Sequence, residues 1–395
     1  MEEWKEYRLS ELCDILSGGT PKTTEPKYWG GGIPWLSVKD FGNVDKYVYT
    51  TEKTITNVGF EHCPSKMLQK DDIIISARGT VGAIAMISSS MSFNQSCFGL
   101  RGNDLVDKHF LYYLMHTKVR ELRSNSHGSV FDTITRNTFD NIICNIPSKV
   151  IQHKIATILS FLDDKIELNR KINSNLEEQA KALFKSWFID FEPFKDGKFV
   201  DSEFGMIPER WNMMSFESFI SESQDKAMVG TYPAYSVTNN GITPRTEKFK
   251  KQLSKATSKE KILRKNDLVF GMSRQILNWG IMQDEIGSVS SAYHVYKIDK
   301  ERTCPTYLRY FIKGYESYFR DLIGTAAREG QSLDKGALMN KKLLVPSKEI
   351  LRSFIQHVTT IENTISLFKS QCRRLSTLRD TLLPRLMSGE IEVRS

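Results

Sequence analysis

The sequence lacks the short motifs that mark most enzymes and metalloproteins. Its six cysteines stand at positions 13, 63, 97, 144, 304 and 372 with no CxxC pair, so neither a zinc site nor a disulfide framework is indicated. No GxxxxGKS or GxxxxGKT loop, GxSxG elbow or HExxH pair occurs, and the glycines at 18–19 and 30–32 lack the GxGxxG spacing. We expect no catalytic centre, and no metal ion or cofactor bound by this chain.

Long hydrophobic runs are also missing. The longest apolar stretches, such as Val81 to Ile87, are far too short to span a bilayer, and the N-terminus is charged from its second residue. Hydrophobic residues make up 40% of the chain and charged residues 26%, as in ordinary globular proteins. We expect a soluble, cytoplasmic protein, and a length of 395 residues indicates two domains.

Positive charge is in excess and unevenly placed. The formal net charge of +8 favours a polyanionic partner. Between Gly241 and Gln275 there are ten Lys or Arg against three Asp or Glu. This basic segment indicates a binding patch, although a solvated loop or helix face would have the same composition. Its cations include Lys248, Lys250, Lys251, Lys255, Lys259, Lys261, Arg264 and Lys265.

The chain repeats itself at an offset of about 200 residues. Residues 66–75 align with 261–270: in both copies a polar turn that contains Asp leads into a short apolar run typical of a buried strand. Trp4 corresponds to Trp211. Two further pairs of segments match, 111–114 with 308–311 and 147–149 with 346–348. We therefore expect one α/β domain to occur twice.

A long helical pattern without glycine follows each copy. Apolar residues recur there at steps of four and three, which is typical of a coiled-coil seam. A helix of about 35 residues is about 50 Å long, too long to be covered by one small domain, so we expect the two helices to pair antiparallel. The alternative is that each helix packs on its own domain. The predicted pair interface is Ile158, Leu162, Ile166, Leu176, Val358, Ile361, Ile365, Phe368 and Leu375.

The ends of these helices also carry signals. Ser148 and Ser347 stand at the expected N-caps, and Pro193 and Pro384 mark where the helices should stop or bend. Asn169 and Asn173 interrupt the first apolar stripe.

Polar and aromatic residues near the expected strand ends suit contact with DNA better than catalysis, because Arg, Asn and Gln pair with base edges. Each could instead be a turn former or surface residue, and Trp35, like Trp29, could be a core anchor. The candidates are Trp35, Lys39, Arg78, Asn94 and Gln95 in the first copy, and Tyr235, Asn239, Asn240, Arg274, Gln275, Tyr293, His294, Arg328 and Gln331 in the second.

With these features together, the chain resembles the specificity subunits of type I restriction–modification systems. The likeness covers nearly the whole sequence as an ordered set of motifs. These are Gly19–Pro21, Tyr28–Gly30 and Ile33–Trp35, Gly79–Gly82 with Asn94–Gln95, the central segment Leu183–Pro193, the lead Asp201–Gly205 and Ile207–Trp211 into the second domain, and the C-terminal segment Leu382–Glu390.

The resemblance implies an α+β fold in which two α/β target-recognition domains, in pseudo-twofold repeat, are separated by an antiparallel coiled coil of two long helices. The expected boundaries are 1–147 for the first recognition domain, 148–192 for the first helix, 193–205 for a linker, 206–346 for the second recognition domain, and 347–395 for the second helix and tail. Residues 287–293 resemble one subclass of the family and have no counterpart in the first domain, so we expect the two half-sites to differ.

The resemblance also implies a role and partners. Each recognition domain would read half of a bipartite site in double-stranded DNA, and the helices would set the spacer. Two modification subunits, which methylate adenine with S-adenosylmethionine, would dock on this chain, and restriction subunits would bring ATP and Mg. Two other classes remain open. A DNA-modifying enzyme would need a methyl-donor or acidic metal site, and a coiled-coil scaffold would leave the repeat and the basic segment unexplained.

Overall fold

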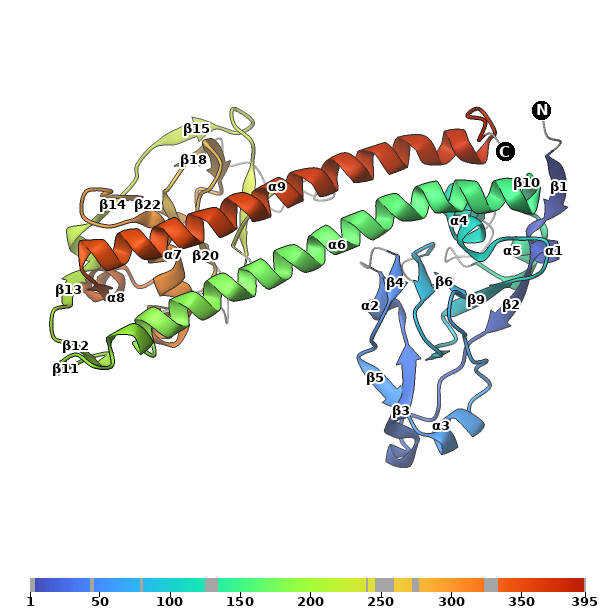
Figure 1. Ribbon diagram of the computed structural model, residues 1–395, viewed down its shortest axis with the longest axis horizontal. Helices are drawn as coiled ribbons and strands as arrows, with labels where there is room; N and C mark the ends of the chain where they lie inside the picture. Colours follow the sequence, from blue (N-terminus) through green and yellow to red (C-terminus); the bar gives the residue numbers. More distant parts are fainter. Residues whose placement is uncertain are drawn as a thin grey trace. The chain divides into compact units, whose positions relative to one another are not determined.

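The computed structural model describes residues 4–42, 46–78, 81–124, 134–238, 241–245, 259–271, 277–322 and 333–393. The chain divides into two compact units. Unit 1 contains Met1–Asn173 and Ser366–Ser395, and unit 2 contains Ser174–Ile365. Two long helices, α6 (Lys149–Phe188) and α9 (Lys348–Met387), each contribute to both units (Figure 1).

Unit 1 contains two small sheets and a separate strand pair. The larger sheet has the order β2-β9-β6-β7-β4, antiparallel except for its last pair, and the smaller has the order β5-β3-β8. The strands are β1 (Lys5–Arg8), which pairs with β10 (Ile143–Ile146), β2 (Cys13–Ser17), β3 (Trp29–Leu36), β4 (Tyr47–Val48), β5 (Lys53–Ile55), β6 (Ile73–Ser76), β7 (Ile84–Ile87), β8 (Ser92–Phe93) and β9 (Cys97–Gly102).

Unit 2 repeats the central part of this topology. Its sheet β14-β22-β19-β20 follows the same order as β2-β9-β6-β7, and β13–β23 corresponds to β1–β10. The strands are β13 (Asn212–Ser215), β14 (Ile220–Glu222), β15 (Lys226–Met228), β16 (Tyr235–Thr238), β17 (Gly241–Pro244), β18 (Lys259–Arg264), β19 (Leu268–Phe270), β20 (Trp279–Ile281), β21 (Ile286–Val289), β22 (His294–Ile298) and β23 (Lys342–Val345). A hairpin of β11 (Phe199–Ser202) and β12 (Gly205–Pro208) precedes them.

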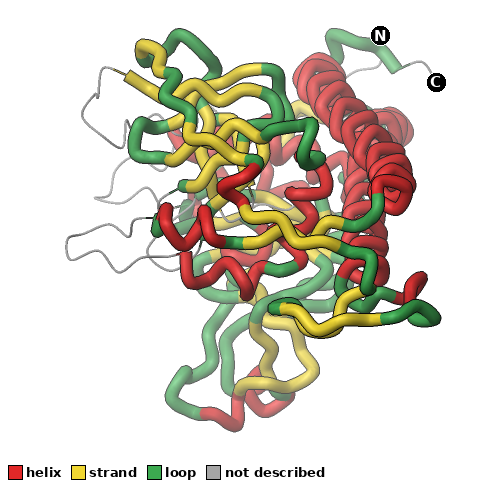
Figure 2. The backbone as a smooth tube through the Cα atoms, turned by 90° about the vertical axis from the view of Figure 1, so that its left-hand side faces the viewer, coloured by secondary structure: helices red, strands yellow, loops and turns green. Residues whose placement is uncertain are grey.

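Short helices connect these strands, and the same two recur. In unit 1, α4 (Lys108–Ser124) and α5 (Arg136–Asp140) precede β10, while in unit 2, α7 (Pro305–Gly314) and α8 (Lys335–Asn340) precede β23. Figure 2 shows how much of the chain outside the long helices runs as short strands joined by loops. The remaining short helices are α1 (Leu9–Leu12), α2 (Val38–Phe41), α3 (Asn57–Glu61), η1 (Pro26–Tyr28), η2 (Glu192–Phe194), η3 (Phe216–Ser218) and η5 (Glu316–Leu322).

The aligned turns before β6 and β19 have the same geometry. Asp71 and Asn266 hold φ of 69° and 73°, a left-handed conformation that Asp and Asn tolerate better than most residues. The next residue, Asp72 or Asp267, accepts a bond of 2.8 Å from the backbone N–H three positions earlier in each copy. The repeat found in the sequence is thus one turn and strand built twice.

The long helices are antiparallel. In unit 1, Asp163, Ile166 and Asn169 of α6 contact Arg379, Cys372 and Gln371 of α9, so the numbers rise along one helix as they fall along the other. Both helices have 40 residues, about 60 Å at about 1.5 Å per residue. The predicted fold class, α+β with a repeated domain and a pair of antiparallel long helices, is confirmed.

Most predicted seam residues are covered, with one exception. Leu162, Ile166, Val358 and Ile365 are buried and Leu176, Ile361, Phe368 and Leu375 are half-buried, but Ile158 is 39% exposed. Ile155 and Leu159 are the buried neighbours, in the core of unit 1. At its start, α6 therefore buries a different face, the one that carries Ile155 and Leu159. The prediction that Ile158 lies in the helix-pair interface was wrong.

The helix ends fit the sequence in part. Ser347 Oγ accepts a bond of 3.4 Å from Ile350 N, as an N-cap does. Helix α6 begins one residue after Ser148 and ends at Phe188, before Pro193. Pro384, however, lies inside the last turn of α9, which continues to Met387. The expected domain boundaries remain a prediction, since the two compact units divide both helices.

Each core takes in the end of a long helix. In unit 1, Leu386 and Met387 of α9 lie in the core with Leu9 and Phe139, and a side chain at Gly389 would lie 3.1 Å from the Trp4 ring. In unit 2, Trp211 packs on Phe188 at the end of α6, with ring centroids 5.6 Å apart. Within the described ranges, no helix combines the length and apolar character that a membrane crossing requires.

Candidate nucleic-acid interface

Three segments of unit 1 meet where strands β3 and β6 end. Asn94 N donates to Leu36 O at 2.9 Å, which places the turn after β8 beside the start of α2. Ala77 N donates to Ser96 O at 2.8 Å, which places the end of β6 beside the same turn. We call the resulting surface, formed by residues 37–41, 77–78 and 94–96, the strand-end edge.

The strand-end edge carries four of the five residues predicted in this domain. Lys39, Arg78 and Gln95 are exposed, while Asn94 is half-buried. The Asn94 Oδ1 atom accepts a bond of 3.2 Å from Ser96 N and so shapes the turn, and Gln95 Oε1 accepts a bond from the Thr20 hydroxyl. The structure thus brings together the segments that carry two exposed cations and an exposed amide.

Glycine is required beside this edge. A Cβ at Gly18 would lie 2.1 Å from Asn94 O, so no other residue fits there while the turn keeps its place. Gly19 N donates to Phe93 O at 2.9 Å. The Gly-Gly pair therefore holds residues 94–95 against the start of the domain.

Trp35, the fifth prediction in this domain, is a core residue. Its side chain is only 7% exposed and its Nε1 atom donates to Gly19 O at 3.0 Å. The ring packs edge-on against Trp29 at 5.1 Å between centroids. This burial fits the alternative that Trp35 is a core anchor, and its indole N–H is already bonded to the backbone of the glycine turn.

Tyr235, predicted in the second domain, is likewise built into the core. It is 7% exposed and its hydroxyl donates to Asp284 at 2.7 Å. A Cβ at Gly287 would lie 2.4 Å from the Tyr235 ring, so Gly287 leaves room for that ring. Tyr235 therefore also has the surroundings of a core residue, and contact with DNA stays a prediction for it.

His294 is the first residue of β22 and Tyr293 directly precedes it, at positions that correspond to the start of β9. His294 Nδ1 lies 3.4 Å from Glu222, whose carboxylate also receives Lys335 Nζ at 2.8 Å. Burial lowers the pKa of His294, whereas the hydrogen bond from Lys335 lowers the pKa of Glu222. Lys261 Nζ donates to Tyr293 O at 2.6 Å, so cations gather here around one carboxylate.

The other predicted contacts lie outside the described residues. They are Asn239 and Asn240, which follow β16, Arg274 and Gln275, which follow Gly271 after β19, and Arg328 and Gln331. In the sequence, Asn239 and Asn240 follow the end of β16, and Arg274 and Gln275 follow the end of β19, as Arg78 follows β6.

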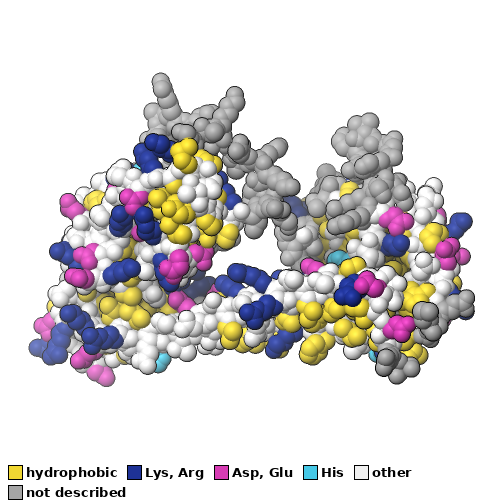
Figure 3. Space-filling view, turned by 90° about the horizontal axis from the view of Figure 1, so that it is seen from above, with side chains coloured by type: hydrophobic (Ala, Val, Ile, Leu, Met, Phe, Trp, Pro, Cys, Tyr) yellow, Lys and Arg dark blue, Asp and Glu magenta, His cyan; other side chains and the backbone are white. Residues whose placement is uncertain are grey.

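The described part of the basic segment is largely paired. Arg264 binds Asp225, and Lys265 binds Glu285. Figure 3 shows basic and acidic side chains intermixed over the described surface on the face drawn. Lys248, Lys250, Lys251 and Lys255 lie outside the described residues. Among the residues that are described, no three His, Cys, Asp or Glu side chains gather where they could hold a metal ion.

One group of polar residues escaped the sequence reasoning. Lys46, Tyr113 and Asp163 are buried and join the first copy to α6. A lone Lys and an Asp inside a helical pattern give no sequence signal, because the two contacts join residues that are 114 and 50 positions apart along the chain.

The comparisons with known proteins agree with this architecture. Residues 1–178 match the family model of the type I restriction modification DNA specificity domain. The MjaIX specificity subunit of Methanocaldococcus jannaschii is 29% identical, covering 99% of this chain and 94% of that protein. The HindI specificity subunit of Haemophilus influenzae is 25% identical, covering 99% and 100%. The crystal structure of the type I S subunit from M. genitalium shares the fold, with a TM-score of 0.57, 15% identity and coverage of 100% and 97%.

Residues 1–178 thus resemble a DNA specificity domain. The full-length relatives extend the similarity to type I specificity subunits over nearly the whole chain.

Proposed function

We propose that the chain is the non-catalytic DNA-recognition subunit of a type I restriction–modification complex. Each recognition domain reads one half of a bipartite target, and the paired helices set the spacer between the halves. The observation that carries this proposal is the repeated sheet, whose strand-end edge in unit 1 carries exposed Lys39, Arg78 and Gln95. Cations bind phosphates, and Arg and Gln can also pair with base edges.

The long helices supply the docking surface in this proposal. In unit 1, α6 exposes Val150, Phe161 and Leu168, and α9 exposes Leu367 and Leu378; the phenyl ring of Phe161 is 68% exposed. In unit 2, a hollow between the two helices is lined by Gln179, Leu183, His357, Thr360 and Ile361. Exposed apolar residues on helices indicate protein contacts.

We assign this surface to modification subunits, which would bring S-adenosylmethionine. Restriction subunits would bring ATP and Mg to the same complex. In this scheme the methyl transfer and the cleavage are carried out by other chains, and this chain supplies the choice of sequence.

The strand-end edge can be tested with two variants and a matched control. Arg78→Ala and Lys39→Ala should each weaken binding of the assembled complex to its target duplex. Each phosphate contact that is lost reduces the slope of log K against log salt by about 1, whereas losing a base contact relaxes one position of the target. Lys70→Ala is the control, since Lys70 is exposed near the start of β6 and Arg78 follows its end.

Mapping the methylated sites in cells that express the system tests the rest of the proposal. A two-part motif with a fixed unspecified spacer is expected. A continuous motif, or an Arg78→Ala complex that binds as the Lys70→Ala complex does, contradicts the assignment.

A further inference from the structure

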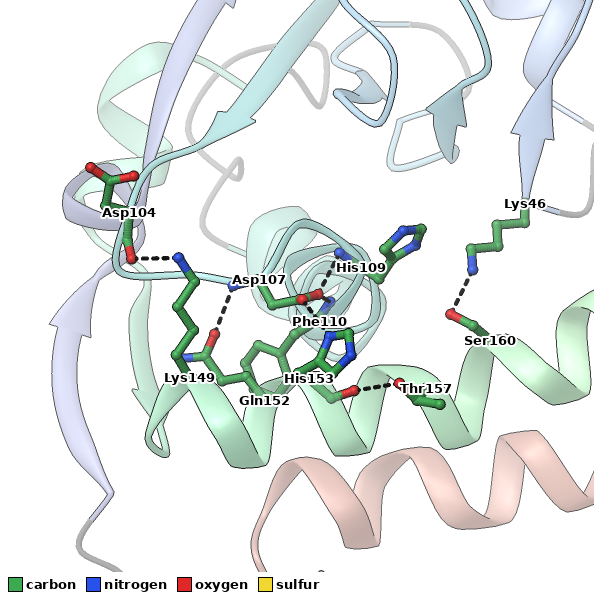
Figure 4. Close-up of polar contacts among 10 residues, drawn as sticks. All are labelled: Lys46, Asp104, Asp107, His109, Phe110, Lys149, Gln152, His153, Thr157 and Ser160. Carbon is green, nitrogen blue, oxygen red and sulfur yellow. Dashed lines mark hydrogen bonds and ion pairs between the residues drawn. The ribbon is translucent and has the colours of Figure 1, made fainter.

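The first recognition domain is joined to α6 by three polar contacts on one face of the helix. Lys46 Nζ donates to Ser160 Oγ at 2.7 Å, Tyr113 OH to Asp163 Oδ2 at 2.5 Å, and Tyr49 OH to Glu167 Oε1 at 2.6 Å. Positions three and four apart lie on the same side of a helix. Figure 4 shows Lys46 reaching α6 from the end of a strand, while the contacts of residues 104–110 lie further toward the helix start.

Asp163 differs from the other two helix residues because it also binds α9. Its Oδ1 atom receives Arg379 Nη1 at 2.6 Å, and its side chain is only 5% exposed. Burial raises the pKa of the Tyr113 hydroxyl, which keeps it protonated as a donor. One carboxylate therefore holds three elements together: α4 through Tyr113, its own helix α6, and α9 through Arg379.

The second copy has a related contact with a different connectivity. Glu362 of α9 accepts bonds from Tyr310 at 3.2 Å and from Arg309. Both donors lie on α7, within the recognition domain. In unit 1 the arginine that binds the carboxylate lies on the other long helix, whereas in unit 2 it lies on α7.

The bonds of Asp163 to α4 and to α9 mean that two different movements would each break one of its contacts. A carboxylate removed from water is costly unless its oxygens are bonded. If α9 slid along α6 by one turn, about 5.4 Å, Arg379 would leave Asp163, and if the domain rocked on α6, Tyr113 would leave it. Asp163 therefore opposes both movements.

We propose that Asp163 is a positioning residue that fixes the angle of the first recognition domain on the helix pair and thereby makes the complex reject targets whose spacer is one base pair too long or too short. This inference rests on the proposed function. One base pair moves a half-site by about 3.4 Å and turns it by about 35°, so rejection requires that the domain cannot rock to follow it.

The test compares affinities for three duplexes that differ only in spacer length. The full chain, assembled with its modification subunits, is measured on the spacer found by methylation mapping and on spacers one base pair longer and shorter. The readout is the affinity for the mapped spacer divided by the affinity for each altered spacer. This ratio does not depend on the fraction of folded protein. Asp163→Asn should reduce this ratio about tenfold, within the range of a single lost base-pair contact, while recognition of both half-sites stays unchanged.

Two further variants separate positioning from folding. Tyr113→Phe removes one hydroxyl and keeps the Asp163–Arg379 ion pair. Like Asp163→Asn, it should reduce the affinity ratio. Glu178→Gln is the matched control, because it makes the same carboxylate-to-amide change on α6 at an exposed ion pair with Lys181, and it should leave the ratio unaltered.

The outcomes are distinct. If Asp163→Asn or Tyr113→Phe complexes bind the target and keep the full spacer selectivity, the positioning role is overturned while the proposed function stands. If the unaltered complex prefers no duplex sequence, the proposed function fails and the inference with it.

Discussion

Buried polar side chains concentrate where α4 meets α6 in unit 1. Asp107 accepts bonds from His109 N at 2.9 Å and Phe110 N at 3.0 Å, and so caps α4 (Figure 4). Gln152 of α6 accepts from Asp107 N at 2.8 Å and donates to two backbone carbonyls. The Nδ1 atom of His109 is buried there and has no hydrogen-bond partner among the described residues.

This environment predicts a pH dependence. Burial and, second, the charge of Lys46 lower the pKa of His109 from 6.5. The unfolded chain therefore takes up the proton first, so the stability that neutral His109 contributes is present above pH 6.5 and is lost as the pH falls below it. Between about pH 7.5 and about pH 5.5, the Tm of the unaltered protein should fall further than that of His109→Gln.

Thermal melts at the two pH values measure this difference. His357→Gln, a change at an exposed histidine of α9, should follow the unaltered protein. Equal losses of Tm in the unaltered protein and in His109→Gln would refute the assignment.

At single residues, the sequence gives the side-chain type but not the burial. Lys39, Arg78 and Gln95 were chosen for their types, and their strands end at one edge. Trp35 and Tyr235 are candidates by their position near expected strand ends, yet both are buried. Their real partners, Gly19 O and Asp284, lie 16 and 49 residues away, and contacts at such separations cannot be obtained from spacing along the chain.

At the scale of elements, the pair of long helices carries buried amides in its seam. Asn169 and Asn173 are buried, and Asn169 Nδ2 donates to Gln371 Oε1 at 3.2 Å. The two Oδ1 atoms have no partner among the described residues. A buried polar atom without a partner costs stability, but a polar residue in such a seam can fix the register of the helices.

Asn169→Leu should therefore stabilise the helix pair and loosen its register. We expect a gain of about 1–3 kcal/mol, the usual cost of an unpaired buried polar group, together with methylation at more than one spacer length. Denaturant melts and methylation mapping measure the two effects. Asn175→Leu, an exposed change on the same helix, should do neither; a destabilised Asn169→Leu protein that keeps a single spacer contradicts the expectation.

Helix periodicity predicted the two long helices but not every surface against which they pack. The stripe through Ile166, Ile365 and Cys372 correctly indicated the antiparallel pair. Ile158 fits the same stripe, yet Ile155 and Leu159 enter the core there, because the strands and short helices of unit 1 rather than α9 determine which face is covered. Pro384 is tolerated because it falls in the last turn of α9, where few helical bonds remain to be lost.

At the scale of the whole molecule, both long helices contain the boundary between the two compact units. The boundary falls after Asn173 in α6 and after Ile365 in α9. Inserting seven residues at both positions preserves the coiled-coil period and adds about 10 Å to each helix. The spacer should lengthen by about three base pairs, at about 3.4 Å each, with both half-sites unchanged.

Methylation mapping of the doubly extended protein checks this. Extending α6 alone should abolish specific methylation, because the seam residues of α6 beyond the insertion are then displaced from the α9 residues on which they pack. A doubly extended protein with the original spacer, or with altered half-sites, would show that the helices do not set the distance.

The discontinuity of unit 1 has a consequence for biosynthesis. Its core contains Leu386 and Met387, whereas its N-terminal part ends at Asn173. At about 5–20 residues per second, a ribosome needs about 10–40 s to make the intervening chain. Unit 2 is continuous in sequence and has all its residues before unit 1 does. The nascent N-terminal domain must therefore wait, with part of its core open, until the last helix leaves the ribosome.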